Sequence, residues 1–323
     1  MKRLIVTADD FGASSFVNEA VIRAFKEGIL RFASLIVDAP AAEEAAKLAK
    51  ENPGLGVGLH LDLCHEFGSD SCFPRHSGES RNPDFRAELD SGLQIAGVTN
   101  RAVWANSPAL WGLRYFFSPY WRKRIASEIS RQLEKFLSLG INPTHADGHT
   151  NIHIHPVIFP ALLRACQKYG ISRIRVPAGE YDLGRRYLKK IPFLNKVEYA
   201  AFGALGPYLK KQAKKIAPQI EILPRCFGLL RSGRMREDYV LRLLENLPEG
   251  DSEIYFHPSL DPKSRVFGDS PTKTHQTITE FETLTSPRIL EALGRLDIAL
   301  FSPGGLDKSK SQTKTTKSPE YGG

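Results

Sequence analysis

The chain has 323 residues, of which 41% are hydrophobic and 25% are charged. These are globular values, so a collagen-like, coiled-coil or wholly disordered chain is excluded. The net charge is +8, but the window 184–215 alone holds nine Lys and Arg residues against one acidic residue, Glu198. The rest is therefore close to neutral, unlike a uniformly basic nucleic-acid-binding protein, and we expect no nucleic-acid partner.

Short apolar runs alternate with helical patterns along the chain. Strands are predicted at 4–8, 34–37, 57–61, 144–147, 174–176, 254–256 and 298–301, and helices at 17–30, 41–50, 127–139 and 157–169. This alternation is typical of βαβ units and a parallel sheet. No apolar run reaches the roughly 18 residues of a membrane span. The N-terminus lacks the longer apolar stretch of a signal peptide, so we expect a cytoplasmic protein.

Two regions do not fit this alternation. Residues 66–100 are polar with little periodicity and are predicted to be a surface insertion. Residues 303–323 are rich in Lys, Ser, Thr and Gly and are predicted to be a disordered tail. Residues 1–302 are expected to form a single domain that includes the basic segment 184–215. Within that segment, Pro192 and Pro207 argue against one long continuous helix.

Polar residues that can bind a metal follow several of the predicted strands. They are Asp9 and Asp10 after the first strand, His60 in the third, Asp147 and His149 after the next, and His257 after 254–256. Because the carboxyl ends of parallel strands meet at one face, we expect these side chains to share a pocket. At the end of a strand the backbone turns, so the adjacent Asp9 and Asp10 could both enter it.

Each feature also has a structural interpretation. Asp9 and Asp10 could cap the following helix, and His60 could be a core histidine bonded to a backbone carbonyl. Together, one carboxylate and two histidines would give a site with open positions for Zn²⁺, Fe²⁺, Mn²⁺ or another divalent ion. A free carboxylate would then be the base and His257 the acid of amide or ester hydrolysis.

The segment 145–155 holds four of the nine histidines of the chain, alternating with smaller or apolar residues. A solvated polar face is the alternative, but such faces usually carry Lys, Glu or Ser. We therefore interpret the segment as part of a metal or catalytic site. His153 and His155, which precede Pro156, are expected to contact ligands or substrate rather than the metal.

In four segments the chain resembles the YdjC/ChbG-like carbohydrate deacetylases. These segments are Thr7–Gly12 with Asn18, Gly58–Leu61, Thr144–His149 and Tyr255–Pro258. The resemblance implies an α/β fold, an irregular TIM-like (β/α) barrel with about seven mainly parallel strands. It also implies a hydrolase that removes an N-acetyl group from an acetylated amino sugar. The chain departs from many relatives at Asn151, where they have a histidine.

The same resemblance implies one divalent metal ion, Mg²⁺, with Zn²⁺ or another transition metal as the alternative. It implies Asp10, His60 and His149 as the metal ligands. Asp9 would be the general base, and His257 the acid.

A narrower resemblance points to the hopanoid biosynthesis-associated branch HpnK. It is carried by Tyr115–Pro119, Phe227–Leu229 and Ser232–Met235, and it implies a lipid-linked N-acetylglucosamine as substrate. The basic segment, interleaved with aromatic and aliphatic residues, suits peripheral contact with an anionic membrane at its inner face. An ordinary solvated helix pair covering the barrel is the alternative. The predicted substrate contacts are Asp147, His153, Arg225 and Arg234, and Arg231 is a further candidate.

Other classes of function remain open. A metal-dependent phosphoesterase or sugar isomerase could use a similar barrel, although no Gly-rich phosphate loop is visible. A non-enzymatic membrane-surface binder would use the basic segment but would leave the histidines unexplained. The four cysteines form no CxxC pattern, so free thiols in a reducing compartment are expected.

Overall fold

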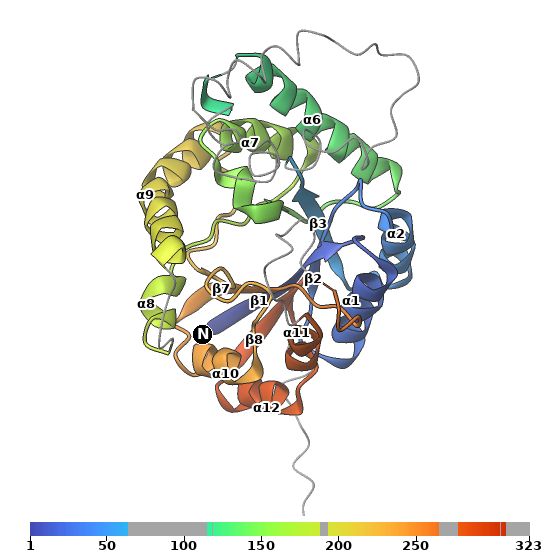
Figure 1. Cartoon of the computed structure of the whole chain (residues 1–323), viewed down its shortest axis with the longest axis vertical. Helices are drawn as coiled ribbons and strands as arrows, with labels where there is room; N and C mark the ends of the chain where they lie inside the picture. The colour runs from blue at the N-terminus through green and yellow to red at the C-terminus, as the bar shows by residue number, and fades with distance from the viewer. Residues whose placement is uncertain (64–114, 118, 188–192, 265–276, 304, 308–323) are drawn as a thin grey trace, which may run out of the picture.

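The computed structural model describes residues 1–63, 115–117, 119–187, 193–264, 277–303 and 305–307. Strands lie at the centre, and the helices form a ring around them (Figure 1). Seven strands pair in the order β5-β4-β3-β2-β1-β7-β6, and β8 pairs with the start of β1. The strands are β1 Lys2–Phe11, β2 Phe32–Leu35, β3 Gly56–Leu61, β4 His145–Gly148, β5 Arg173–Ile174, β6 Cys226–Phe227, β7 Gly250–Phe256, β8 Ile298–Ser302 and β9 Gly305–Asp307.

The sheet curls into an irregular barrel. Neighbours in the seven-strand order are parallel, and antiparallel pairing among the described strands is confined to β8 and β9. Two isolated bridges, Arg173–Glu221 and Gly179–Cys226, link the β5 edge to the β6 edge. The prediction of a TIM-like barrel with about seven mainly parallel strands is confirmed.

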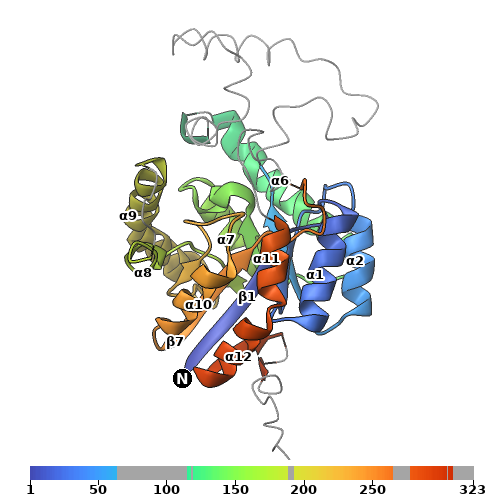
Figure 2. The ribbon, with the colours of Figure 1, turned by 60° about the horizontal axis from the view of Figure 1, so that its bottom comes forward.

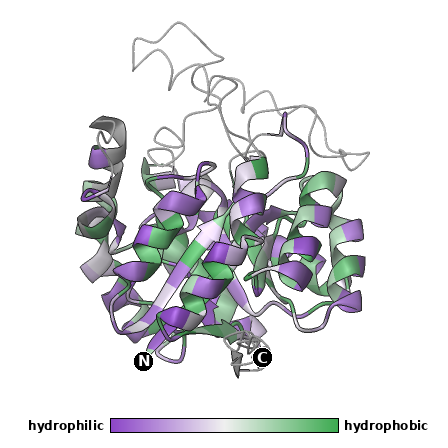
Figure 3. Ribbon diagram, turned by 90° about the horizontal axis from the view of Figure 1, so that it is seen from below, coloured by the Kyte–Doolittle hydropathy of each residue, from purple (hydrophilic) through white to green (hydrophobic). Residues whose placement is uncertain are grey.

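The covering helices are amphipathic. In α1, buried Val17, Ala20, Val21 and Ala24 recur at helical spacing, so one stripe of the helix faces the sheet. Figure 3 shows hydrophilic and hydrophobic residues mixed along such helices. The helices are α1 Ser15–Glu27, α2 Ala42–Glu51, α6 Pro119–Ser138, the 3₁₀ helix η1 His149–Ile154, α7 Ile158–Tyr169, α8 Glu180–Gly184, α9 Phe193–Ile216, α10 Glu237–Glu245, α11 Thr277–Leu284 and α12 Pro287–Arg295.

The central strands are buried along nearly their whole length. β1 runs through the molecule with α1, α2 and α11 on one side and α7, α9 and α10 on the other (Figure 2). β2 and β3 are buried at every position, and β1 from Leu4 onward, as expected of parallel strands covered on both faces. Polar side chains within these strands therefore need partners inside the protein.

The basic segment differs from the prediction. α9 is one continuous helix of 24 residues that contains Pro207, so the expectation that this proline interrupts the helix is wrong. Proline removes the hydrogen bond to the carbonyl four residues earlier, here that of Gly203. Gly203 and Pro207 are both exposed, so water can bind this carbonyl.

Several predicted regions fall partly or wholly outside the described residues. They are the insertion 66–100, Pro192, and most of the tail. β9 lies within the segment predicted to be a tail, and it pairs with β8. Among the described helices, none combines the length and the apolar character needed to cross a membrane.

Candidate active site

Asp9 and Asp10 reach one site because β1 is irregular at its end. The register between β1 and β2 shifts between Ala8 and Phe11, and Asp10 has φ +62°, a conformation uncommon for residues other than glycine. In a regular strand, successive side chains would point to opposite faces. The bulge instead brings two adjacent carboxylates, each 3% exposed, to the same face. The backbone thus turns at the end of this strand, as the sequence analysis expected.

Gly12 and Asn18 hold this turn. Gly12 has φ +94°, and a Cβ there would lie 2.9 Å from Leu35 Cδ1, so the position favours glycine. The Gly12 backbone amide donates to Asn18 Oδ1 at 2.8 Å, and the Asn18 side-chain Nδ2 donates to the Ala41 carbonyl at 3.1 Å. The buried Asn18 side chain thereby ties α1 to the loop that carries the two carboxylates.

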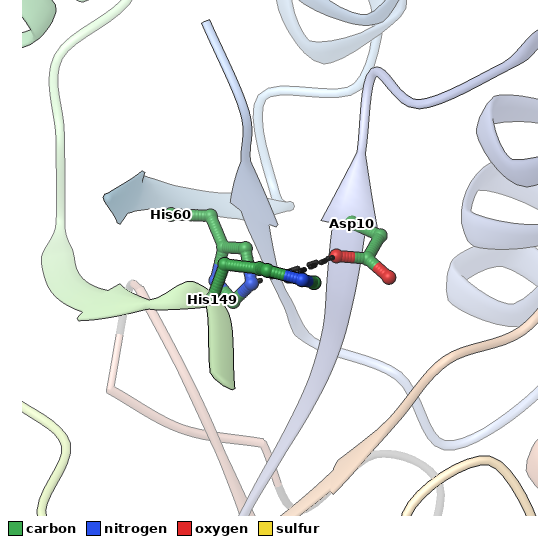
Figure 4. A group of neighbouring side chains, drawn as sticks. All are labelled: Asp10, His60 and His149. Carbon is green, nitrogen blue, oxygen red and sulfur yellow. Dashed lines mark ion pairs between the residues drawn. The ribbon is translucent and has the colours of Figure 1, made fainter. Parts of the chain in front are cut away.

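Asp10, His60 and His149 point toward one another from β1, β3 and η1 (Figure 4). Asp10 Oδ1 lies 3.5 Å from His60 Nε2 and 3.4 Å from His149 Nδ1. Two atoms that bind one ion at about 2.1 Å, at a tetrahedral angle, lie about 3.4 Å apart. The spacing therefore fits a shared divalent cation, and this buried group could hold a metal ion.

The electrostatics of the group also fit a cation. Burial raises the pKa of Asp10, but the hydrogen bond and charge of His149 outweigh it and hold that pKa well below its usual range. Burial lowers the pKa of His60, but the charge of Asp147 and the hydrogen bond to it raise that pKa to about 9. A divalent cation would take the place of the proton on the metal-facing nitrogen of His60.

Asp9 lies beside this group and is held by Arg175. Arg175 Nη1 donates to Asp9 Oδ2 at 2.6 Å, whereas Asp9 Oδ1 is buried and has no hydrogen-bond partner among the described residues. His257 Nε2 lies 3.9 Å from Asp9 Oδ2. Because Phe256 of β7 pairs with Ala8 of β1, the sheet itself places His257 next to Asp9.

Arg175 is a site residue that the sequence interpretation missed. Its guanidinium is buried and forms ion pairs with Asp9, with Asp147 at 2.9 Å and with Glu253 at 3.0 Å. Burial lowers the pKa of Arg175, but these carboxylates raise it well above its usual value, so the side chain stays charged. The available signal was a charged residue inside the apolar strand candidate 174–176, where a buried charge requires partners.

A second buried group, Asp9, His60 and Asp147, also brings its potential ligand atoms within 4.8 Å of one another. Arg175 already binds both of these carboxylates. The positive charge that this group attracts is therefore supplied by the protein, which leaves the group of Asp10, His60 and His149 as the better metal site.

Glu280 supports His257 from α11. The His257 amide donates to the Glu280 carboxylate, which also accepts the Met235 amide at 2.8 Å. Burial raises the pKa of Glu280 to about 8, and its Oε2 lies 3.9 Å from His257 Nδ1. Nothing in the sequence pattern singled out this residue.

Asp147 and His153, which were predicted to contact substrate, lie inside the protein. Both side chains have no exposed surface. Asp147 Oδ1 lies 2.7 Å from His60 Nδ1, and His153 Nε2 donates to the Arg175 carbonyl at 2.8 Å. Burial lowers the pKa of His153 to about 4. Their positions favour support of the neighbouring site residues over contact with substrate.

The predicted arginine contacts lie in different places. Arg225 donates to the carbonyls of Glu249 and Asp251, at the end of β7 opposite His257, because it directly precedes β6, which runs parallel to β7. The structure therefore does not bring Arg225 together with the other site residues. Arg234 is exposed in the loop after β6, and its contact with substrate stays a prediction.

Two cysteines fall within the described residues, and both are buried free thiols. Burial raises the pKa of Cys166 and of Cys226 well above the usual value. A nucleophile needs the thiolate form, so neither thiol is suited to that role.

Fold and site together define an α/β barrel with a candidate metal centre at the carboxyl ends of its strands. The family model described as YdjC-like protein matches residues 3–295. The chain therefore belongs to the YdjC-like family, as its resemblance in sequence predicted.

Two curated relatives are similar to this chain over different lengths. A carbohydrate deacetylase from Geobacillus stearothermophilus is 37% identical over 165 residues, which are 51% of this chain and 56% of that protein. A carbohydrate deacetylase from Mus musculus is 28% identical over 321 residues, which are 95% of this chain and 96% of that protein. The match to the Geobacillus protein thus spans just over half of its length.

A solved structure shares the fold. It is a protein from Enterococcus faecalis V583 that was assigned provisionally to cellobiose-phosphate cleavage. The TM-score is 0.59 at 20% identity, over 92% of this chain and 95% of that chain. At this identity the likeness shows the fold alone.

Proposed function

We propose that the chain is a metal-dependent carbohydrate deacetylase that hydrolyses the N-acetyl group of an acetylated amino sugar. The observation that carries this proposal is the convergence of Asp10, His60 and His149 beside Asp9 at one face of the barrel. Membership in the YdjC-like family and the carbohydrate deacetylases among its relatives support the substrate class.

In this hydrolysis, water adds to the acetyl carbon, the C–N bond breaks, and the leaving amine takes up a proton. When bound, a divalent cation would polarise the acetyl carbonyl and make water more acidic. Asp9 accepts the proton of the attacking water at Oδ1, the oxygen that has no hydrogen-bond partner in the described part of the chain. Arg175 keeps Oδ2 occupied, so it fixes which oxygen of Asp9 acts as base.

His257 delivers the proton to the amine nitrogen from Nε2. This atom lies 3.9 Å from Asp9 Oδ2, so base and acid are close enough to act on one amide. Both are largely buried, with 3% and 8% of their surface exposed, and in such a site fixed charges act more strongly than in water.

For the metal, we propose Mg²⁺, which the family resemblance implies, with Zn²⁺ or another transition metal as the alternative. Two imidazoles and one carboxylate are ligands typical of a transition metal. Elemental analysis of the purified protein, followed by EDTA treatment and addition of each ion singly, distinguishes them. The ion that restores acetate release at the lowest concentration is the native candidate, and activity that survives EDTA would contradict the proposal.

We further propose that the substrate is a lipid-linked, hopanoid N-acetylglucosamine reached at an anionic membrane surface. Phe117 is 81% exposed and Phe116 39% exposed, and the exposed Arg122 and Lys123 follow on α6. α9 adds exposed lysines at 210, 211, 214 and 215. Aromatic side chains with nearby basic ones suit an anionic lipid surface.

An ordinary covering role accounts for part of α9, because its Leu209 and Ala213 are buried against the core. Sedimentation with vesicles distinguishes the two interpretations. We expect binding to phosphatidylglycerol vesicles that falls with added salt and with Phe117→Ala. If the same fraction of protein sediments with neutral as with anionic vesicles, α9 is an ordinary solvated helix.

Mass spectrometry of an N-acetylglucosaminyl lipid incubated with the enzyme tests the reaction itself. Loss of one acetyl group, with equimolar acetate, is the expected result, and free N-acetylglucosamine serves as the comparison substrate. Phosphate release from a sugar phosphate without any acetate release would favour a phosphoesterase, and an isomerised sugar would favour an isomerase.

A further inference from the structure

Asp147 has both carboxylate oxygens in use on the side of His60 that faces away from the metal group. Its Oδ1 lies 2.7 Å from His60 Nδ1, and its Oδ2 accepts the Ser34 hydroxyl proton at 2.7 Å. Arg175 is 2.9 Å from the same Oδ2. With no exposed surface, Asp147 cannot reach a substrate without leaving these partners.

The contacts continue beyond Asp147. Ser34 has one hydroxyl proton and gives it to Asp147, so its oxygen is free to accept from His145 Nε2 at 3.1 Å. His145 then carries its proton on Nε2, and its Nδ1 lies 2.9 Å from the Thr144 hydroxyl, which also contacts the Val57 carbonyl at 3.1 Å. Burial, followed by the charge of Arg173, keeps the pKa of His145 well below its usual value, which agrees with a neutral ring.

Three adjacent strands build this arrangement. Ser34 lies on β2, His60 on β3, and His145 and Asp147 on β4, and His60 pairs in register with Asp147. Gly58, opposite Ser34 in the ladder, is part of it, because a Cβ at that position would lie 2.5 Å from the His145 ring. Glycine therefore leaves the space that the imidazole fills.

We propose that Asp147, Ser34 and His145 form a buried hydrogen-bond chain that holds His60 with its proton on Nδ1 and its Nε2 lone pair directed at the metal. This His60 support chain makes Asp147 a positioning residue for a metal ligand, not a contact for substrate. The inference rests on the metal centre of the proposed function. Carboxylates that bind the outer nitrogen of a metal-ligating histidine fix its tautomer and raise its basicity.

Metal affinity tests the support chain directly. Full-length protein stripped with EDTA is titrated with Mn²⁺ by calorimetry and by electron paramagnetic resonance. Asp147→Asn is expected to weaken the Kd for Mn²⁺ by about 10–100-fold, the usual effect of losing such a partner. Ser34→Ala is expected to weaken the Kd as well, but by less. This second variant keeps the inference testable if Asp147→Asn does not fold.

Ser252→Ala is the matched control. Ser252 is a buried serine with no exposed surface on β7, and its hydroxyl forms no hydrogen bond with the support chain or with any other described residue. Its removal should leave the Kd at the wild-type value. Thermal unfolding of the metal-free proteins is measured alongside, because a merely structural role would lower Tm in the variants without changing the Kd.

The protonated nitrogen of His60 gives a second measurement. In the Mg²⁺- or Zn²⁺-loaded protein, long-range ¹H–¹⁵N spectra of the imidazoles should show the proton on Nδ1, and Ser34→Ala should broaden or shift that signal. Wild-type Kd values in both variants, or a proton on Nε2, would overturn the inference while leaving the deacetylase proposal intact. A wild-type protein that binds neither Mn²⁺ nor any other divalent ion would overturn both.

Discussion

In the proposed metal half of the site, Asp10 faces two imidazoles, those of His60 and His149. In the proposed proton-transfer half, Asp9 is held by a buried cation, Arg175. Asp9 and Asp10 are adjacent and chemically identical. Asp10 faces two imidazoles and is suited to bind a metal. Asp9 has one oxygen bound by Arg175 and the other available as a base. Their surroundings, not their residue type, separate the two tasks.

The two halves are nevertheless connected. Asp147 contacts His60 in the metal half and Arg175 in the proton-transfer half. Even so, the proposed roles predict different losses. A change at a metal ligand should remove both the bound metal and turnover, whereas a change at the base should remove turnover alone. Substitutions in each half, and one outside both, test this division.

The largest effect is expected from Asp10→Asn. Loss of the carboxylate charge removes the anionic ligand between two imidazoles, so the metal affinity should fall by more than the roughly 100-fold seen for outer partners. Acetate release should fall to background. Elemental analysis and an acetate assay measure the two, and a variant that retains a full complement of metal would refute the ligand assignment.

Asp9→Asn should abolish proton transfer and leave metal binding unchanged. Turnover is expected to fall by about 10²- to 10⁴-fold, the range for loss of a general base, while the metal content stays near one ion per chain. The same two assays apply. If Asp9→Asn keeps full turnover, the base assignment is wrong.

Arg175 variants sharpen the comparison. Arg175→Met leaves buried carboxylates without a cation, so the free energy of unfolding in urea should fall by about 3–5 kcal/mol. Arg175→Lys keeps the charge but cannot span Asp9 and Asp147 with a planar fork. It should therefore lose kcat with little change in KM, and a wild-type kcat in this variant would contradict a positioning role for the guanidinium.

Glu180, outside both halves, gives the smallest expected effect. Burial raises its pKa from 4.5 to about 7, and its carboxylate binds the Leu230 amide and the Tyr239 hydroxyl. Between pH 4.5 and 7 the folded state keeps a proton that the unfolded state has lost, so stability falls as pH rises, by about 3 kcal/mol from this residue.

Glu180→Gln should flatten this part of the stability profile without changing metal affinity. Urea midpoints at pH 4.5 and pH 7.5 measure it, with exposed Glu245→Gln as the control. A variant that loses stability between these pH values as steeply as the wild type would show that Glu180 does not hold the extra proton.

Much of the fold could be predicted because apolar runs end in polar residues at the carboxyl ends of β1, β3, β4 and β7. β6 could not, since it has two residues and no periodicity to detect. Pro207 was misleading because an exposed helix can leave one carbonyl to water. The position of Arg225 could not be predicted, because a basic residue next to a strand does not indicate which end of the strand its side chain reaches.

The sequence by itself determined which residue types stand at the strand ends, and these predicted a metal and acid–base site at one face of a parallel barrel. The residue pattern alone left open which of two adjacent aspartates faces the imidazoles; the resemblance implied Asp10, and the tertiary structure places Asp10 there. That choice depends on a bulge at Asp10 and on Arg175, which lies 166 residues from Asp9 in the chain. The local sequence pattern shows the spacing of apolar side chains, whereas the partner of a buried charge depends on which distant residues the fold brings next to it.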